Sequence, residues 1–441
     1  MPPLMRTFDT GEVPILDSGG VHRTLAVVLA VAIVLTLVGC SADPAPTAGT
    51  ESSASSTSGG SQTGSTSTTS GKPAGSLSAG ALLEARRMAE FTLAPFDVDP
   101  ELSVGTLNGT GSMNLDSDDG PPRADPEVLD FLLPDPVDAE VDGNEYIAGY
   151  AFVGETEGTS YPKSRTLKNI VVRYATATDA GAAVAALVAA TQNLRQLASV
   201  ATSPTDASSI PGHPEAAAVT YTALSGATQV IAVSAREHYA LIQSVQATGG
   251  ESIAAGLVAE ALTRQQERID AFTPTPVDQL ESLSEDLSGL VSLTIPAVDG
   301  FSSANDGAFG PHGALSHSES PAATDAAYRD AGVEQVVFSK VAGLDEEVPT
   351  ELSVLQVEVD DGTTRLADYL ATLPPNEDWR PIGPADGVSA SRCFQAPGEP
   401  FAGYLRFYCV STTKAFVVDA LGEDKWNVFD TMRRQHDQLE E

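Results

Sequence analysis

Hydrophobic and polar residues alternate in regular runs over the part of the chain that can build a core, residues 79–441. In its first half, a strand over 169–174 precedes a helix over 180–197, whose apolar side chains recur every three or four residues. A second helix is expected over 252–272. Three strands are predicted between these helices, at 217–223, 228–235 and 238–248, the last two joined by a tight turn near Arg236 and Glu237.

The second half repeats this order. Its strands are predicted at 354–359, 388–395, 404–411 and 415–421, and its helices at 364–373 and 424–439. Residues 169–174 align with 354–359 at an offset of 185, and Val233 and Ser234 align with Val410 and Ser411 at an offset of 177. The pattern therefore predicts two diverged copies of a β-α-β-β-β-α unit.

Three consecutive short strands favour an antiparallel meander, so the expected fold class is α+β with helices packed on one face of each sheet. The two domains are predicted at 79–275 and 285–441. Ile253 and Phe272 of one closing helix, and Trp426 and Leu439 of the other, are expected to face the sheets.

The beginning of the chain predicts export. His22 and Arg23 precede about 14 apolar or small residues, whereas a helix that spans a membrane needs roughly 20. Leu37, Val38 and Gly39 before Cys40 resemble the bacterial lipobox, in which the Cys thiol is diacylated and the chain is cut before it. Two acyl chains give stable anchoring. We therefore expect residues 1–39 to be a signal peptide and Cys40 to carry the lipid.

A tether is predicted at residues 40–78. Between Thr50 and Gly71, 19 of 22 residues are Ser, Thr or Gly, so no core can form there. If the whole tether behaves as a random coil, its root-mean-square end-to-end distance is roughly 35 Å. The folded part is then expected on the extracytoplasmic face of the cell membrane.

Charge and cysteine content add two expectations. The chain has a formal net charge of −36, which makes nucleic acid a poor partner, because phosphate binding depends on Lys and Arg. With Cys40 acylated, Cys393 and Cys409 remain, and two thiols outside the cytoplasm favour one disulfide. Both fall on neighbouring predicted strands, within disulfide range. A redox-active pair is the alternative, although no Cys-x-x-Cys spacing supports it.

Catalytic motifs are weak in this sequence. Ser411 and Lys414 match the Ser-x-x-Lys spacing of penicillin-recognising enzymes, but they fall at a turn between strands and the companion motifs do not occur. His436 lies beside the apolar stripe of the last helix and is expected to be packed or half exposed. We predict no catalytic residue and no enzyme activity.

Metal motifs are equally weak. Asp116, Asp118, Asp119 and Glu127 hint at a calcium loop, but Pro121 occupies the turn position that needs Gly, so a solvated acidic loop is preferred. His312, His317 and Glu319 could ligate zinc on a flexible segment, and surface histidines are the preferred interpretation. No metal site and no cofactor is predicted.

Several segments carry a resemblance to a known family. They are Met88 to Glu90, Pro95 to Leu102, Phe309 to Leu315, and the Cys393/Cys409 pair followed by a terminal helix. Together they resemble the uncharacterised two-domain cell-envelope lipoproteins of mycobacteria and related actinobacteria, across nearly all of the exported chain. The resemblance implies two tandem α+β domains and supplies no reaction. The disulfide-bearing unit is also distantly similar to extracellular sensor domains of mycobacterial serine/threonine kinases.

Three function classes follow. The first is a non-catalytic ligand-binding or sensor module of the envelope, with a small molecule or lipid held in a pocket lined by both halves. The alternative is a structural or adaptor protein that binds another envelope protein through an exposed apolar patch. An envelope hydrolase is ranked last, because it would need catalytic groups that the fold alone brings together.

Overall fold

The computed structural model describes residues 79–105, 111–112, 133, 146–158, 163–193, 206–286, 288–298, 306–344, 349–358, 361–373, 379–397 and 405–441. All of them lie in one compact unit of the chain. The predicted signal peptide, Cys40, the tether and the acidic loop at 116–127 lie outside the described residues. No helix in the described part is long and apolar enough to cross a bilayer.

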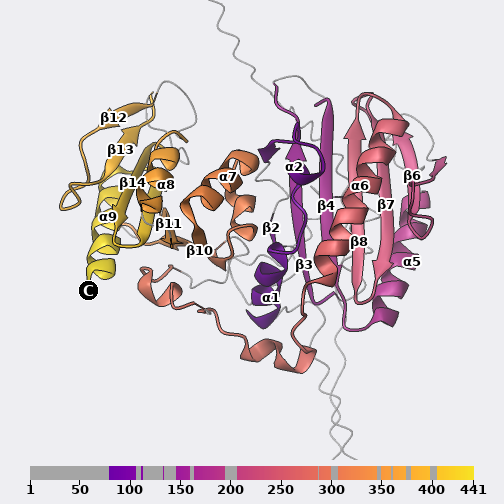
Figure 1. Ribbon diagram of the computed structural model, residues 1–441, viewed down its shortest axis with the longest axis horizontal. Coiled ribbons are helices and arrows are strands. Elements are labelled where there is room, and N and C mark those ends of the chain that lie inside the picture. The colour runs from indigo at the N-terminus through magenta and orange to yellow at the C-terminus, as the bar shows by residue number, and fades with distance from the viewer. Residues whose placement is uncertain are drawn as a thin grey trace, which may run out of the picture. The chain divides into compact units, whose positions relative to one another are not determined.

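The first half of this unit is an antiparallel sheet with the strand order β1-β3-β4-β8-β7-β6-β5, and β2 also pairs with β3 (Figure 1). Its strands are β1 (Val104–Gly105), β2 (Gly111–Ser112), β3 (Ala148–Glu155), β4 (Arg165–Arg173), β5 (Asp206–Ser208), β6 (Ala217–Thr222), β7 (Thr228–Arg236) and β8 (Tyr239–Ala247). Its helices are α1 (Ala79–Ala89), α2 (Pro95–Val98), α5 (Ala177–Asn193) and α6 (Glu251–Asp270).

The second half is a sheet with the order β12-β13-β14-β15-β11-β10-β9. Its strands are β9 (Gly307–Phe309), β10 (Val333–Val341), β11 (Thr350–Val357), β12 (Arg380–Ile382), β13 (Arg392–Gln395), β14 (Phe407–Thr413) and β15 (Phe416–Gly422). Its helices are α7 (Pro321–Ala331), α8 (Gly362–Leu370) and α9 (Lys425–Glu440), and the 3-10 helices are η2 (Val277–Ser282), η3 (Val291–Leu293) and η4 (Gly313–His317).

The two halves share one topology. The order β3-β4-β8-β7-β6-β5 in the first sheet matches β10-β11-β15-β14-β13-β12 in the second, and helices α5 and α6 correspond to α8 and α9 along the chain. The offset of 185 relates β4 to β11, and the offset of 177 relates β7 to β14. The predicted α+β class and the repeat are confirmed, while each copy has extra strands at its beginning and at its edge.

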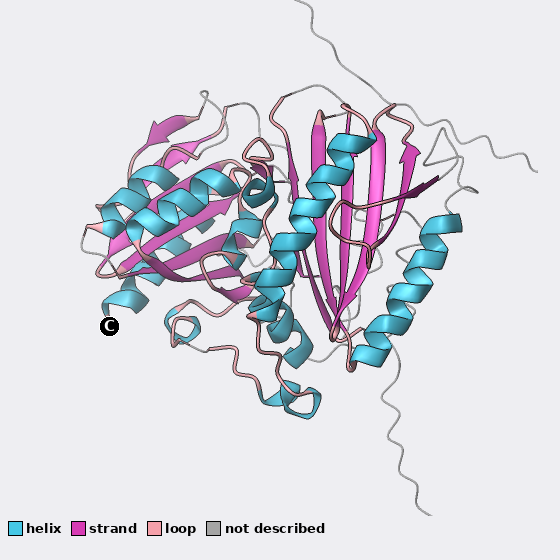
Figure 2. Ribbon diagram, turned by 45° about the vertical axis from the view of Figure 1, so that its right-hand side comes forward, coloured by secondary structure: helices cyan, strands magenta, loops and turns pink. Residues whose placement is uncertain are grey.

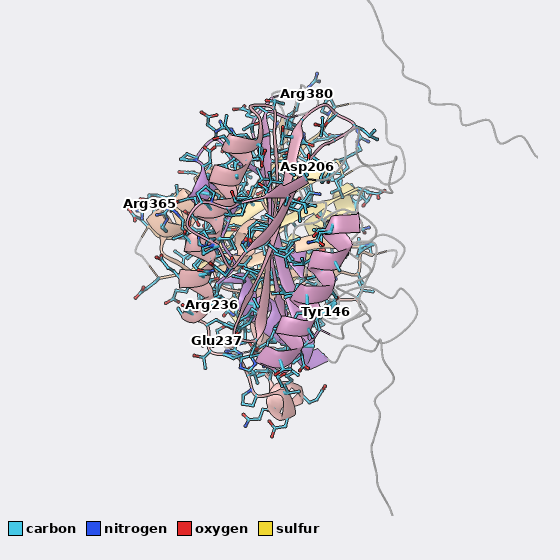
Figure 3. The ribbon with its side chains drawn as sticks, turned by 90° about the vertical axis from the view of Figure 1, so that its right-hand side faces the viewer. Tyr146, Asp206, Arg236, Glu237, Arg365 and Arg380 are labelled. Carbon is cyan, nitrogen blue, oxygen red and sulfur yellow. A yellow bond between two sulfur atoms is a disulfide. The ribbon has the colours of Figure 1, made fainter. Side chains whose placement is uncertain are left out.

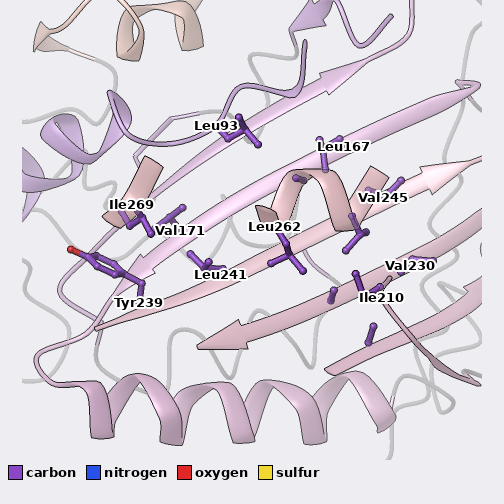
Figure 4. Packing of buried hydrophobic residues seen from close by; sticks show 14 of the residues in the cluster. Leu93, Leu167, Val171, Ile210, Val230, Tyr239, Leu241, Val245, Leu262 and Ile269 are labelled. Carbon is purple, nitrogen blue, oxygen red and sulfur yellow. The ribbon is translucent and has the colours of Figure 1, made fainter. Parts of the chain in front are cut away.

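The predicted packing of helices on one face is wrong. In the first sheet, α5 packs Ala183 and Leu187 against Ile170, while α6 packs Val258 and Leu262 with Val171. Adjacent strand residues point to opposite faces, so the two helices cover opposite faces of the sheet (Figure 2). Figure 4 shows Leu262 and Ile269 of α6 directed toward the sheet. The second sheet repeats this arrangement, with α7 and α8 on one face and α9 on the other.

The turn between β7 and β8 lies where the sequence predicts it. Glu237 adopts a positive φ of 49°, which suits a tight hairpin turn. Arg236 and Glu237 lie together at one end of the sheet (Figure 3), and Arg236 Nε donates to Asp270 Oδ1 at 2.8 Å. This exposed ion pair connects the end of α6 with the hairpin.

Two apolar side chains predicted to face the sheets do not. Ile253 is 46% exposed and Trp426 is 58% exposed, whereas Phe272 and Leu439 are buried as expected. Both exceptions lie in the first turn, at the N-terminal end, of their helices α6 and α9. Lys425 Nζ lies 5.1 Å from the centre of the Trp426 ring, so this indole meets a cation instead of the core.

A buried ion pair holds α1 against the first sheet. The Glu84 side chain is fully buried, and its carboxylate accepts hydrogen bonds from Arg173 of β4 and from Arg87, the latter at 2.5 Å. Thr275 contributes its backbone N–H at 2.8 Å and its hydroxyl at 2.8 Å. Every oxygen of this carboxylate therefore has a donor.

The two halves also share a hydrophobic core. One buried cluster joins Tyr150 and Phe152 of β3 to Phe309, Leu315 and Tyr328 of the second half. The two sheets are therefore packed parts of one body in the described region. The predicted domain boundaries at 275 and 285 stay predictions.

Candidate functional site on the second sheet

Two of the segments that carry the family resemblance, around Glu90 and around His312, meet at the interface between the two halves. We call this interface the joint. Glu90, directly after α1, accepts hydrogen bonds from the backbone N–H groups of His312 at 3.2 Å and Gly313 at 2.9 Å. A Cβ atom at Gly310 would collide with the same carboxylate, and one at Gly313 would collide with Ala89. The absence of side chains at these glycines allows the close approach. The two segments therefore build a structural joint.

His312 belongs to this joint. Its Nε2 lies 2.8 Å from the Thr92 carbonyl oxygen and 3.1 Å from Arg268 Nη1, while Arg268 Nη2 donates to Asp97 at 2.6 Å. Burial, followed by the positive charge of Arg268, lowers the pKa of His312. A neutral ring protonated on Nε2 donates to Thr92, and Arg268 then has Asp97 as its main partner. The ring is a structural hydrogen-bond donor.

His317 points to different partners. Its ring stacks on Phe338 at 3.8 Å between centres, and its Nδ1 lies 3.1 Å from Ser316 Oγ, which receives a hydrogen bond from the Tyr150 hydroxyl at 2.6 Å. Glu319 is exposed. The three candidate zinc ligands are not brought together, and no group of three or more metal-ligating side chains occurs in the described region. The preference for surface histidines is wrong as well, because both rings pack into the joint.

The other residues singled out from the sequence are part of the packing and crosslinking of the second sheet. Cys393 and Cys409 form a disulfide between directly opposite positions of β13 and β14, with Cα atoms 4.1 Å apart. Ser411 is 2% exposed within β14, and Lys414 Nζ donates to the Leu439 carbonyl at 2.6 Å. The Lys414 side chain is thus bound to the end of α9, and His436 is partly exposed as expected.

Two hollows in the described surface are small. One, of about 160 Å³, lies between α8 and the strands β13 and β14 and includes Asp368 and Arg392. The other, of about 90 Å³, lies at the joint and includes Arg86, Glu90, Glu285 and Gln335. Pockets for metabolites or drug-sized ligands typically measure about 300–1,000 Å³. Neither hollow has room for a lipid.

The feature with the most chemical character is Asp419 in β15, which sequence reasoning missed. Asp419 is directly opposite Ser353 of β11 and Val410 of β14. Directly opposite residues share a face of the sheet. Val410 belongs to the cluster under α7 and α8, so the carboxylate lies on that face as well. Its hydrogen bond among the described residues comes from Ser353 Oγ, at 3.1 Å.

The electrostatic surroundings of Asp419 are unfavourable to its charge. Burial, with a smaller contribution from the nearby Glu351 carboxylate, raises the pKa of Asp419 to about 7. Asp419 in turn raises the pKa of Tyr328 and of Tyr408, after the larger effect of their own burial. The residue keeps partial solvent contact. No cation of the described region forms an ion pair with it.

Aromatic side chains gather on this face. Tyr328 and Tyr408 are buried in the cluster, and large side chains around them are partly exposed, namely Phe338, Tyr369, Trp379, Phe394 and Leu421. The Trp379 indole N–H has no hydrogen-bond partner among the residues that the structure describes. We call Asp419 with these aromatic residues the Asp419 face. It combines a carboxylate, hydroxyl groups and rings at the partly exposed rim of the sheet face that α7 and α8 cover.

Comparison with known proteins gives a family. The N-terminal domain of DUF7373, a domain of unknown function, matches residues 71–284, and the C-terminal domain of DUF7373 matches residues 294–432. The chain belongs to the DUF7373 family. Both halves of this DUF7373 protein therefore fall within known family domains, and the family description assigns no activity to them. No curated protein matches the chain.

One solved structure matches this DUF7373 chain. It is the crystal structure of the extracellular domain of PknH from Mycobacterium tuberculosis, with 16% sequence identity and a TM-score of 0.24. The match covers 30% of this chain and 70% of the PknH chain. A likeness of this size supports no conclusion about function.

Proposed function

We propose that this DUF7373 protein is exported, anchored through a lipid on Cys40 to the outer face of the cell membrane, and binds an envelope protein without catalysing a reaction. The short apolar segment before Cys40 and the Ser/Thr/Gly-rich tether after it support the address. The Asp419 face supports the binding role. Its carboxylate is retained on the sheet face that α7 and α8 cover, without an ion pair among the described residues, which costs stability and is typical of functional sites.

The small hollows favour a protein partner over a metabolite or lipid. A metabolite is usually enclosed in a pocket, whereas a protein partner is bound on an open face with a few aromatic or charged anchors. The Asp419 face is closer to the second kind, because α7 and α8 cover only part of it and Phe338, Phe394 and Leu421 remain partly exposed on it.

The binding role is tested by photocrosslinking in intact cells. A photoreactive phenylalanine analogue replaces Phe394 in the Asp419 face, and the same analogue replaces the exposed Ile253 of α6 as the control position. We expect one protein to crosslink at position 394 and not at 253. Equal crosslinking at both positions, or none at 394, would refute the binding role of this face.

The lipid anchor is tested separately. Cys40→Ser removes the thiol that would be acylated, so we expect the variant to leave the membrane fraction and its N-terminal peptide to lose the mass of the lipid. A variant that remains membrane-bound as tightly as the wild type would overturn the proposed anchor.

A small-molecule ligand is the second candidate, favoured by the hollow at the joint. That hollow is lined by both halves and holds Arg86, Arg87 and Glu90 together. Native mass spectrometry of the protein purified from its own host tests this role. A stoichiometric bound compound that is lost on Glu90→Gln would support it.

A further inference from the structure

The chemistry of the partner can be narrowed, on the condition that the proposed binding function holds. We infer that the Asp419 face binds a basic side chain, the ammonium group of a lysine or the guanidinium group of an arginine on the partner protein. The Asp419 carboxylate supplies the counter-charge, and the surrounding aromatic rings cover the apolar part of that side chain.

Asp419 lacks a counter-charge in the described part of the chain. Arg392 and Lys340 lie on strands of this face, and neither forms an ion pair with Asp419. Arg392 of β13 donates to Asp368 of α8 at 2.6 Å. Lys340 of β10 is exposed and directly opposite Glu351, where its charge offsets part of the rise that burial causes in the pKa of Glu351. Among the described residues Ser353 donates a hydrogen bond to Asp419 and no cation forms an ion pair with it, and a largely buried carboxylate without a cation is destabilising. A cation from outside the chain would complete the site.

Aromatic side chains share the sheet face with Asp419. The cluster that includes Asp419's neighbours contains Tyr328 and Tyr408, with Phe338, Tyr369 and Phe394 at its partly exposed rim. Aromatic rings attract ammonium and guanidinium groups through their quadrupole, more strongly where water is excluded. Within the same chain, Lys425 already lies 5.1 Å from the Trp426 ring centre and 4.8 Å from that of Phe429. A carboxylate next to several rings therefore favours a cation over a neutral or anionic group.

The net charge of the chain and the solvent contact of Asp419 also favour a basic side chain. The chain has a formal net charge of −36, so its field repels acidic partners and attracts basic ones. Asp419 lines neither of the two small hollows. Asp419 lies on the face that α7 and α8 cover and keeps partial solvent contact. Such a position suits a long side chain from a partner, because lysine and arginine carry their charge at the end of an apolar stem.

The test uses n-butylammonium chloride as a mimic of the lysine head group and measures thermal unfolding of the full protein at pH 8. Sodium chloride at equal ionic strength and 1-butanol serve as references for charge screening and for the apolar stem. We expect butylammonium to raise the Tm by a few degrees at about ten times its dissociation constant. Asp419→Asn should weaken its apparent affinity at least about tenfold. Asp386→Asn, which changes an exposed aspartate of the same half, should leave it unchanged.

Acidity gives a second comparison within the same experiment. At pH 5 Asp419 is protonated, since its pKa is raised to about 7, and the butylammonium effect should disappear. Glu351 of β11, whose pKa is also raised by burial, is the other carboxylate that acts on Asp419, and Glu351→Gln should reduce the effect without abolishing it. An equal Tm rise in wild type and Asp419→Asn, or no rise in the wild type at pH 8, would overturn the inference.

The proposed function can fail separately. If position 394 crosslinks to a partner while butylammonium has no effect, the face binds a protein by other chemistry and only this inference is wrong. If butylammonium binds as expected but position 394 captures nothing specific, the cation site stands as a site for a free amine, and both the protein partner and the proposed function are wrong.

Discussion

Each half of the molecule buries a carboxylate, and the two have opposite surroundings. Glu84 in the first half is fully buried and is bound by Arg173, Arg87 and Thr275. Asp419 in the second half is partly buried among aromatic rings, with Ser353 as its hydrogen-bond donor. A paired carboxylate recovers much of its desolvation cost, and an unpaired one does not. Glu84 is therefore understood from the fold alone, whereas Asp419 costs stability that the fold does not explain.

The two halves also differ in how each is stabilised. They have the same strand order, yet the first is fixed to α1 by an ion pair and the second is crosslinked by Cys393 and Cys409. Each half therefore has its own stabilising device. Variants of each device should show which part of the molecule depends on it.

The largest expected effect is that of Glu84→Gln. The variant leaves the Arg173 guanidinium buried without a counter-charge, so we expect a loss of about 3–5 kcal/mol in the free energy of unfolding, measured in urea. Glu267→Gln, a change of an exposed carboxylate on α6, is the control and should alter the stability by less than about 0.5 kcal/mol. A loss below about 1 kcal/mol for Glu84→Gln would mean that the ion pairs of Glu84 do not stabilise the fold, so that Glu84 would not differ from the unpaired Asp419.

The disulfide should have the next largest effect. It joins residues separated by 16 positions, and a loop of that size contributes about 3 kcal/mol by restricting the unfolded chain. Replacing both cysteines with alanine should lower the Tm, and a reductant should have no further effect on the double variant. If a reductant lowers the wild-type Tm while the double variant remains as stable as the oxidised protein, the bridge does not stabilise the second sheet.

Asp419→Asn should have the opposite sign and stabilise the protein. The folded-state pKa of Asp419 is raised to about 7, above the ordinary value near 4, so its cost grows as the pH rises from about 4 to 7 and is complete above 7. After allowance for its partial solvent contact, we expect a gain of about 2 kcal/mol at pH 8. The gain should shrink steadily toward pH 4 in urea unfolding. A destabilised variant at pH 8 would show that the carboxylate has a counter-charge after all.

Much of the fold can be read from the sequence, because it depends on local periodicity. The strand and helix patterns predict the central strands, the helices α5 and α6 with their counterparts, and the repeat itself. The placement of helices on both faces was also readable. Ile170, Val171 and Val172 form a continuous apolar run, which is typical of a strand buried on both sides.

The candidate site is harder to read. Asp419 interrupts the apolar run from Val417 to Leu421, and a lone carboxylate in such a strand was a usable signal. The surroundings that make Asp419 a candidate site include Ser353 and Tyr328, which are more than 60 residues away along the chain. The fold brings them close to Asp419 by placing β11 and α7 beside β15. Local pattern contains no information on which distant side chains face a residue. The joint between Glu90 and His312 was hidden for the same reason.

The smallest expected effect is that of a substitution at His312 in the joint. The contribution of His312 to stability depends on pH in the opposite direction to that of Asp419. The folded-state pKa of His312 is lowered by burial and by Arg268, so its stabilising contribution is present above the ordinary value near 6.5 and is lost as the pH falls below it. His312→Gln, in which the side-chain amide can still donate to Thr92, should remove about 1 kcal/mol of this acid sensitivity between pH 6.5 and 5. Unfolding in urea at these two pH values, with Asp419→Asn as the background, separates the two groups. An acid sensitivity that is unchanged in His312→Gln would show that the ring is charged in the folded protein and that the joint tolerates it.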